Sequence, residues 1–271
     1  MERILYFFMA LLAVATYKGL SNSQFRNKFV FETDGILVRK EYYRLLSSGF
    51  LHANWLHFLF NATAIYTFAE FLLIEIGPWP TLFLYTASLL GGSLLSLYVH
   101  RNHSDYSALG ASGAAFGLAF ATIAINPEGS LGFFFIPVSF TAWHVGLAFL
   151  LISIIGIKRN ADNIGHEAHL GGAIVGLFLA PYYYRDLLEY NLLIYLVMLI
   201  PAIAFVIFII KYPAYLLNSS IKAGELVNLP SFKFSGKSDE EELNKLLDKI
   251  NAKGIESLSK SERKRLKRLS A

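Results

Sequence analysis

The chain has 271 residues, of which 55% are hydrophobic and only 16% are charged. Soluble domains carry about 25% charged residues, so this composition indicates an integral membrane protein. It excludes a disordered chain, a nucleic-acid-binding module and a small disulfide scaffold. The sequence contains no cysteine, which excludes thiolate chemistry, disulfides and cysteine-ligated metal sites.

The net charge of +4 is unevenly distributed along the chain. Residues 1–211 hold 12 Lys/Arg and 12 Asp/Glu, whereas residues 212–271 hold 12 Lys/Arg and 8 Asp/Glu. The sequence therefore predicts a transmembrane domain over 1–211 and a basic soluble C-terminal tail over 212–271. Capping-box spacing after Ser238 and Ser259 predicts two short helices in this tail, at about 239–251 and 260–269. The alternative for the tail is a solvated structural appendage.

Seven apolar segments follow one another, and most approach the roughly 20 residues that a helix needs to cross a bilayer. They are residues 4–20, 52–74, 79–99, 111–126, 132–157, 165–184 and 192–210. The first segment could also be a signal peptide, but no small-residue cleavage site follows it, so we expect a retained helix. The fourth is the shortest, which is tolerable if protein surrounds it.

Polar side chains inside membrane helices are costly and are therefore candidates for function. In the second segment, His57 and Asn61 are four residues apart, so both project from one helical face. His52 precedes His57 by five residues and points elsewhere. Alternatively, His52 anchors the helix at the membrane interface while His57 and Asn61 hold helices together.

The fourth segment begins with Gly110-Ala-Ser112-Gly113 and continues to Gly117. Gly113 and Gly117 form a small-residue face that lets another helix approach closely, and Ser112 stands at its entry. Taken in isolation, so short a motif is explained more simply by packing alone.

In the sixth segment, His169, Gly172 and Gly176 line one face of a helix, so the histidine can reach a close neighbour. Glu167 lies on a different face of this helix and is a poor partner for His169. The alternatives are a histidine that holds helices together, or a metal pair of His166 and His169. A third ligand of the usual kind is not obvious nearby.

Joined together, the three motifs favour catalysis. In an alternating topology the second, fourth and sixth segments enter the membrane from the same face, and each motif lies near the N-terminal end of its segment. The side chains of Ser112, His57 and His169 therefore fall in one layer below one membrane surface. With Asn61, this layer holds a nucleophile, a base and two hydrogen-bond donors, which are the parts of an acyl-transfer site.

At these residues the chain resembles the rhomboid family of intramembrane serine proteases. The resemblance covers about residues 40–185. It is carried by Tyr43-Arg44, the spacing His52…His57…Asn61, Gly110-Ala-Ser112-Gly113 and Ala168-His169-x-x-Gly172-x-x-x-Gly176. It implies an all-α polytopic membrane protein with a rhomboid-like six-helix core. This chain would add a seventh C-terminal transmembrane helix and a short helical tail.

The resemblance also implies roles for single residues. Ser112 would be the nucleophile and His169 the general base of a dyad without a third acid, and His57, Asn61 and the backbone near Ser112 would form the oxyanion site. Structural roles would fall to His52, Arg44, Gly110, Gly113, Gly172, Gly176 and Phe116. Active relatives often carry a tyrosine at the position of Phe116, which stacks under the catalytic histidine. Phenylalanine keeps that surface and loses the hydroxyl.

We therefore predict a serine endopeptidase that cleaves transmembrane proteins through an acyl-enzyme and needs neither a metal nor an organic cofactor. Its expected partners are transmembrane protein substrates and the lipid bilayer, with no nucleic acid, and we expect it in a bacterial cytoplasmic (inner) membrane. The alternative is a catalytically weak rhomboid-like protein that binds membrane clients, although such relatives typically lack the serine or the histidine. A transporter would need intramembrane charges facing a pathway, for which Glu70 and Glu75 are weak candidates.

Overall fold

The computed structural model describes residues 2–133, 136–159 and 164–212, together with the single residues 249, 259, 261, 262 and 265. The chain divides into two compact units, Met1–Ser219 and Ser220–Ala271. The division of the chain at 211/212 into a transmembrane domain and a soluble tail stays a prediction.

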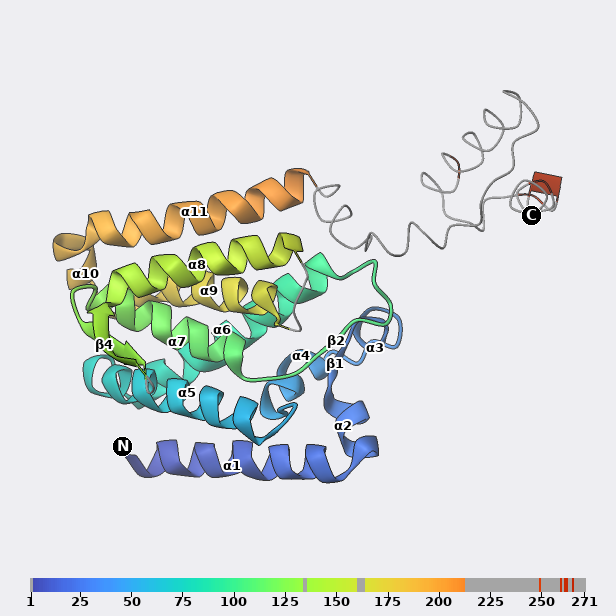
Figure 1. Ribbon diagram of the computed structural model, residues 1–271, viewed down its shortest axis with the longest axis horizontal. Coiled ribbons are helices and arrows are strands. Elements are labelled where there is room, and N and C mark those ends of the chain that lie inside the picture. The colour runs from blue at the N-terminus through green and yellow to red at the C-terminus, as the bar shows by residue number, and fades with distance from the viewer. Residues whose placement is uncertain are drawn as a thin grey trace. The chain divides into compact units, whose positions relative to one another are not determined.

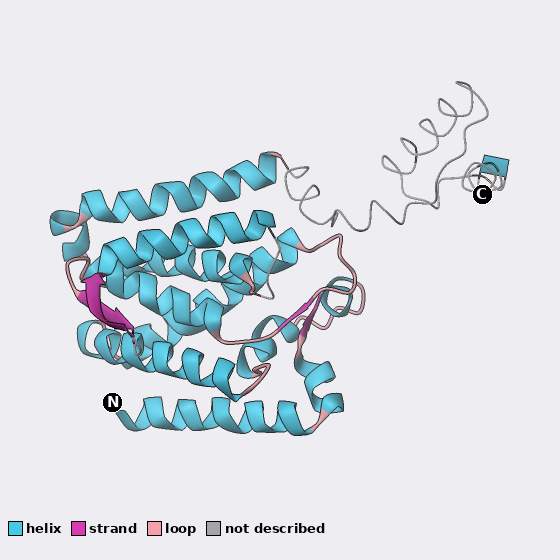
Figure 2. Cartoon of the chain, in the orientation of Figure 1, coloured by secondary structure: helices cyan, strands magenta, loops and turns pink. Residues whose placement is uncertain are grey.

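The first unit is a bundle of helices (Figures 1 and 2). Its long helices are α1 (Glu2–Ser21), α5 (Trp55–Glu75), α6 (Pro78–Val99), α7 (Ser112–Ile125), α8 (Ala142–Arg159), α9 (His166–Tyr183) and α11 (Leu192–Lys211). Its short helices are α2 (Ser23–Phe29), α3 (Thr33–Leu37), α4 (Arg44–Ser47), the 3-10 turn η1 (Ser48–Phe50) and α10 (Asp186–Tyr190). In Figure 1, α1 and α11 lie along opposite edges of the bundle. The predicted fold class, an all-α polytopic membrane protein, is confirmed.

Among the described residues, two small antiparallel sheets accompany the helices (Figure 2). In the first, β1 (Phe31–Glu32) pairs with β2 (Ser107–Ala108). In the second, β3 (Ser130–Phe133) pairs with β4 (Ile136–Thr141). Figure 2 shows these sheets at opposite ends of the bundle.

Three helices of the described residues are long and apolar enough to cross a membrane by length and composition: α5, α6 and α11. Shorter apolar helices cover Leu5–Ser21, Ser112–Ile125 and Ala142–Ile157. These helices make the chain an integral membrane protein, while the predicted number of seven spans stays a prediction.

The predicted helix over 132–157 is wrong over its first part. Residues 130–133 and 136–141 form the paired strands β3 and β4, with Ser130 opposite Thr141, and α8 begins only at Ala142. Most residues of this stretch are aromatic or β-branched, which favours strands, and Pro137 has no N–H to donate within a helix. An apolar run by itself does not distinguish a buried strand from a helix.

The centre of the bundle is α7, which packs against α5, α6, α8 and α9. Most of its side chains are buried. Its 14 residues extend for about 21 Å at 1.5 Å per residue, whereas the hydrocarbon core of a bilayer is about 30 Å thick. The helix α7 is therefore shorter than the core of a bilayer.

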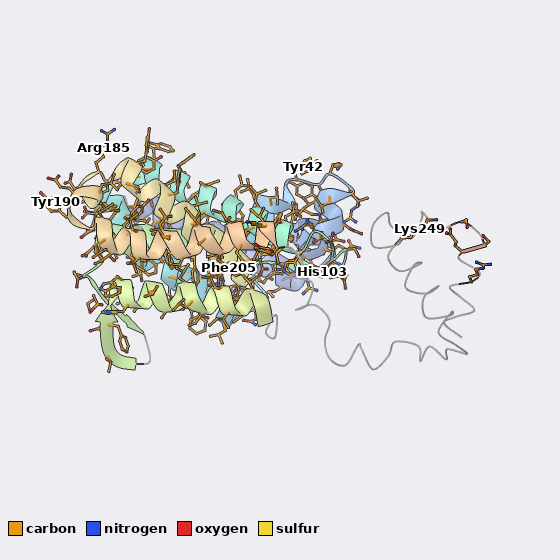
Figure 3. The ribbon with its side chains drawn as sticks, turned by 90° about the horizontal axis from the view of Figure 1, so that it is seen from above. Tyr42, His103, Arg185, Tyr190, Phe205 and Lys249 are labelled. Atoms are coloured by element: carbon orange, nitrogen blue, oxygen red, sulfur yellow. The ribbon has the colours of Figure 1, made fainter. Side chains whose placement is uncertain are left out.

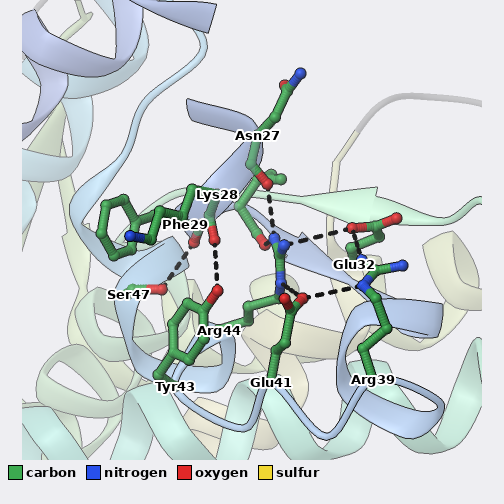
Figure 4. Close-up of polar contacts among 10 residues, drawn as sticks. Asn27, Lys28, Phe29, Glu32, Arg39, Glu41, Tyr43, Arg44 and Ser47 are labelled. Carbon is green, nitrogen blue, oxygen red and sulfur yellow. Dashed lines mark hydrogen bonds and ion pairs between the residues drawn. The ribbon is translucent and has the colours of Figure 1, made fainter. Parts of the chain in front are cut away.

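The long connection 21–51 is built around Arg44, whose side chain is only 5% exposed (Figure 4). Its Nη1 donates to the carbonyl oxygens of Asn27 at 2.8 Å and Val30 at 2.7 Å, and its Nε donates to Glu41 Oε2 at 2.6 Å. The Arg44 guanidinium beside Glu41 holds the pKa of that carboxyl below its usual range. Arg44 thus ties α4 to the C-terminal end of α2. The structural role predicted for this residue stays a prediction.

Replacing Arg44 by alanine should lower the free energy of unfolding by about 2–4 kcal/mol, because two backbone carbonyls lose their donor. Thermal unfolding of the detergent-solubilised protein measures this effect. The matched control is Arg39→Ala, whose side chain is 46% exposed and whose ion pairs with two glutamates lie near the surface. Exposed ion pairs contribute little, so equal destabilisation by the two variants would contradict the role of Arg44.

In the second unit, the described residues include the capping box predicted at Ser259. Ser259 N–H donates to Glu262 Oε2 at 2.7 Å, and Glu262 N–H donates to Ser259 Oγ at 3.3 Å. This reciprocal pair is a capping box. The Lys249 ammonium, 2.7 Å from Glu262 Oε1, and these backbone and hydroxyl contacts lower the pKa of Glu262 to about 2. The remainder of the two predicted tail helices lies outside the described residues.

Candidate active site

Ser112 and His169 meet where α7 and α9 begin. Ser112 is the first residue of α7, and His169 lies in the first turn of α9. Ser112 Oγ is 2.8 Å from His169 Nε2. A neutral imidazole that accepts the serine proton at Nε2 carries its own proton on Nδ1. The pair therefore has the geometry of a nucleophile beside its base.

Glycines allow the two helices to come this close. A Cβ on Gly172 would fall on the carbonyl of Gly113, and a Cβ on Gly176 would fall on the carbonyl of Gly117. A Cβ on Gly113 would itself lie 3.2 Å from the carbonyl oxygen of Ala168. The structure thus brings together the two glycine faces that the sequence predicted for the fourth and sixth segments.

Phe116 lies one turn after Ser112 and stacks on the His169 ring. The two ring centroids are 4.1 Å apart, with an angle of 6° between the planes. Phe116 also meets Phe149 of α8 edge to face, with centroids 5.5 Å apart. The Phe116 ring thus lies flat against the His169 imidazole.

His57 and Asn61 lie beside the backbone that leads into Ser112. Gly110 has φ +130°, which favours glycine, and a Cβ there would lie 2.8 Å from His57 Cε1 and 3.8 Å from Asn61 Nδ2. His57 Nδ1 accepts the N–H of Ala53 at 3.4 Å, so a neutral His57 ring carries its proton on Nε2. A Cβ on Gly110 would lie 2.9 Å from that Nε2. Glycine at position 110 therefore leaves room for the His57 ring, two residues before the serine.

His52 lies before α5 and serves a different contact. Its Nδ1 is 2.8 Å from Thr16 Oγ1 of α1, and the side chain is buried. Its ring meets that of His57 edge to face, with centroids 5.1 Å apart. Burial, with His57 nearby, lowers the pKa of His52 to about 4. His52 thus joins α1 to the segment just before α5, and its predicted structural role stays a prediction.

The alternative reading of His166 and His169 as a metal-binding pair would need a third ligand. Among the described residues, no group of three His, Asp or Glu side chains could hold a metal ion. The two rings meet edge to face with centroids 6.0 Å apart. His166 packs against Gly156 of α8, where a Cβ would fall on its ring.

A family model described as a rhomboid domain matches residues 39–186, more than half of the chain. The chain belongs to the rhomboid family. A second model, described as a family of unknown function (DUF6576), matches residues 234–271.

Three relatives illustrate the range of the family. RHOMBOID-like protein 12, mitochondrial, from Arabidopsis thaliana is 32% identical over 171 residues, which cover 57% of this chain and 50% of that protein. Rhomboid protein 1, mitochondrial, from Saccharomyces cerevisiae is 29% identical over 54% of this chain and 44% of its own length. Rhomboid protease GluP from Bacillus subtilis is 27% identical over 60% of this chain and 30% of its own length.

The chain thus spans half or less of the length of these relatives. Two of them are mitochondrial and one is bacterial. The chain is an integral membrane protein. A bacterial cytoplasmic membrane is not supported, because two of the three relatives are mitochondrial, and it stays a prediction.

Sequence reasoning missed part of the surroundings of the dyad. On α6, a Cβ on Gly92 would lie 2.6 Å from the Ala168 carbonyl oxygen, and a Cβ on Gly171 would lie 2.6 Å from that of Gly91. The Gly91-Gly92 pair in an apolar segment is a signal that could have revealed this third helix of the contact. Glu167 turns to His100 and Tyr106, and no local pattern connects these residues.

Replacing Gly176 by valine should destabilise the bundle by at least about 1–3 kcal/mol, because the new side chain would overlap the Gly117 carbonyl and separate α7 from α9. Thermal unfolding in detergent measures this. Gly132→Val is the matched control, since a Cβ at Gly132 meets no atom within 4 Å. An unfolding temperature equal to that of the control would mean that the two helices do not touch at Gly176.

Proposed function

We propose that the protein is an intramembrane serine endopeptidase that cleaves transmembrane proteins. The observation that carries the proposal is the 2.8 Å contact between Ser112 Oγ and His169 Nε2. A serine hydroxyl is a weak nucleophile until an adjacent base takes its proton. The Bacillus subtilis relative is named a rhomboid protease, which supports the same reaction.

In the proposed reaction, His169 Nε2 takes the proton of Ser112 Oγ as the oxygen attacks the scissile carbonyl carbon. The tetrahedral intermediate collapses when the carbon–nitrogen bond breaks and His169 gives the proton to the leaving amine. The acyl-enzyme on Ser112 is then hydrolysed by water, with His169 again acting as base. These steps need only protein side chains and water, so the proposal includes no metal or organic cofactor.

His57 and Asn61 are the proposed donors to the oxyanion. The proton on His57 Nε2 lies next to Gly110, as argued above from its Nδ1 contact. Asn61 Nδ2 donates one N–H to the His57 carbonyl oxygen at 3.1 Å, and its other N–H is proposed for the oxyanion. Donors aimed at the developing charge in a site shielded from water stabilise the transition state strongly.

The substrates are proposed to be transmembrane proteins because Ser112 opens a helix shorter than the bilayer core. The chemistry would then take place below the membrane surface, where a peptide bond of a neighbouring transmembrane segment can reach it. The lipid bilayer is therefore part of the proposed working environment.

Ser112→Ala and His169→Ala should each lower cleavage of a reconstituted transmembrane substrate by about 1,000-fold or more, because each removes one member of the dyad. Ser112→Ala should also abolish labelling by a fluorophosphonate, which reacts with activated serines. Product formation on a gel and fluorescence of the labelled band measure the two effects.

The controls are Ser130→Ala and His144→Ala, which change the same residue types at exposed positions on β3 and α8. Near-normal turnover in either dyad variant would refute the dyad. A wild-type protein that binds the substrate but neither cleaves it nor takes the label would instead support the client-binding alternative.

His57→Ala and Asn61→Ala should each lower kcat by about 100-fold while KM changes little, because an oxyanion donor acts mainly in the transition state. His52→Ala serves as the contrast: it should lower the unfolding temperature by removing the contact with Thr16. Steady-state kinetics and thermal unfolding separate these outcomes. A change confined to KM for His57 and Asn61 would count against the oxyanion role.

A further inference from the structure

A buried carboxylate, Glu167, lies two residues before His169 in α9, with a side chain only 6% exposed. Its Oε1 accepts the hydroxyl of Tyr106 at 2.5 Å and Nε2–H of His100 at 3.2 Å. Burial and the neighbouring Glu167 charge raise the pKa of Tyr106, so its phenol stays protonated and donates. An ionised carboxylate without donors would be costly in this position, so the two contacts are needed together.

Both donors come from the connection between α6 and α7. His100 follows the end of α6 and stacks flat on Tyr106, with centroids 3.5 Å apart and 6° between the planes. Its Nδ1 lies 3.2 Å from Nδ1 of His103, so the contacts continue along the connection. In Figure 3, His103 lies at the end of the bundle opposite to Arg185.

The same connection leads directly to the nucleophile. The Tyr106 carbonyl accepts the N–H of Thr33 at 3.2 Å, and the next residues form β2, which pairs with β1. Gly110 N–H then donates to the Ser48 carbonyl at 3.1 Å, and Ser112 follows two residues later. Only five residues therefore separate Tyr106 from Ser112, and backbone hydrogen bonds hold this short segment in place.

We infer that Glu167 is a positioning residue for the dyad and acts through Tyr106 and His100. It ties the start of the helix that carries His169 to the segment that carries Ser112, and so fixes the separation of base and nucleophile. The inference rests on the proposed function and adds to it the group that holds the dyad in register. A misplacement of about 1 Å can cost about 100-fold in rate.

The first test measures kcat and KM with a reconstituted transmembrane substrate. Glu167→Ala and Tyr106→Phe should lower kcat about 10- to 100-fold, with KM changed by less than about twofold. Glu167→Gln should keep most of kcat, because its carbonyl oxygen can accept both hydrogen bonds. Adding Tyr106→Phe to Glu167→Ala should cause little further loss, since the two side chains act as a unit. Ser107→Ala, an exposed neighbour in β2, is the matched control.

The second test does not depend on proteolysis. In protein labelled with ¹⁵N-histidine, the NMR signal of His169 reports its hydrogen bond to Ser112, and Ser112→Ala gives the signal that remains when this bond is lost. Glu167→Ala and Tyr106→Phe should move the His169 signal towards that reference. Glu167→Gln and Ser107→Ala should leave it at the wild-type position.

The two tests separate the inference from the proposed function. An inactive wild-type protein whose His169 signal still shifts in Glu167→Ala would refute the protease and support the positioning role. An unchanged His169 signal in Glu167→Ala and Tyr106→Phe would overturn the inference, whatever the activity. So would a lower unfolding temperature with unchanged kcat, or an equal loss of kcat in Glu167→Gln and Glu167→Ala.

Discussion

The arrangement of this protein depends on direct backbone contact between α7 and α9. Gly172 and Gly176 present no side chain where they face the carbonyl groups of Gly113 and Gly117. Helices in lipid gain little from the hydrophobic effect when they associate, so close van der Waals packing has to hold them together. The same contact brings His169 to within hydrogen-bond distance of Ser112. The close glycine contact between α7 and α9 therefore accounts both for the packing of these helices and for the pairing of Ser112 with His169.

Buried ionised side chains organise the connections at the end of the bundle where α7 and α9 begin. Arg44 satisfies two backbone carbonyls at the C-terminal end of α2, and Glu167 binds Tyr106 and His100 from the connection before α7. Strands β1 and β2 join these two regions. Such groups are expensive away from water unless every donor and acceptor is paired. Their pairing therefore gives the connections a defined shape, which the glycine-rich helices alone would not impose.

Much of the fold and of the candidate site could be predicted because helical periodicity is a local property. Spacing of three and four residues placed His57 with Asn61, and His169 with Gly172 and Gly176, on shared faces. The same reasoning failed for 132–133 and 136–141, where part of an apolar run forms the strands β3 and β4. Hydropathy measures how well a segment avoids water, but it carries no information about the backbone conformation in which it does so.

The sequence by itself determined that the chain enters a membrane, that it is helical, and which side chains share a helical face. Only the tertiary structure decided which faces meet. Thr16 reaches His52 across 36 residues, Tyr106 reaches Glu167 across 61, and Ser112 reaches His169 across 57. A local pattern fixes the direction in which a side chain leaves its own helix. Which residue that side chain contacts depends on how all the helices pack. The contacting residues lie on segments far apart in the sequence, so no local pattern links them.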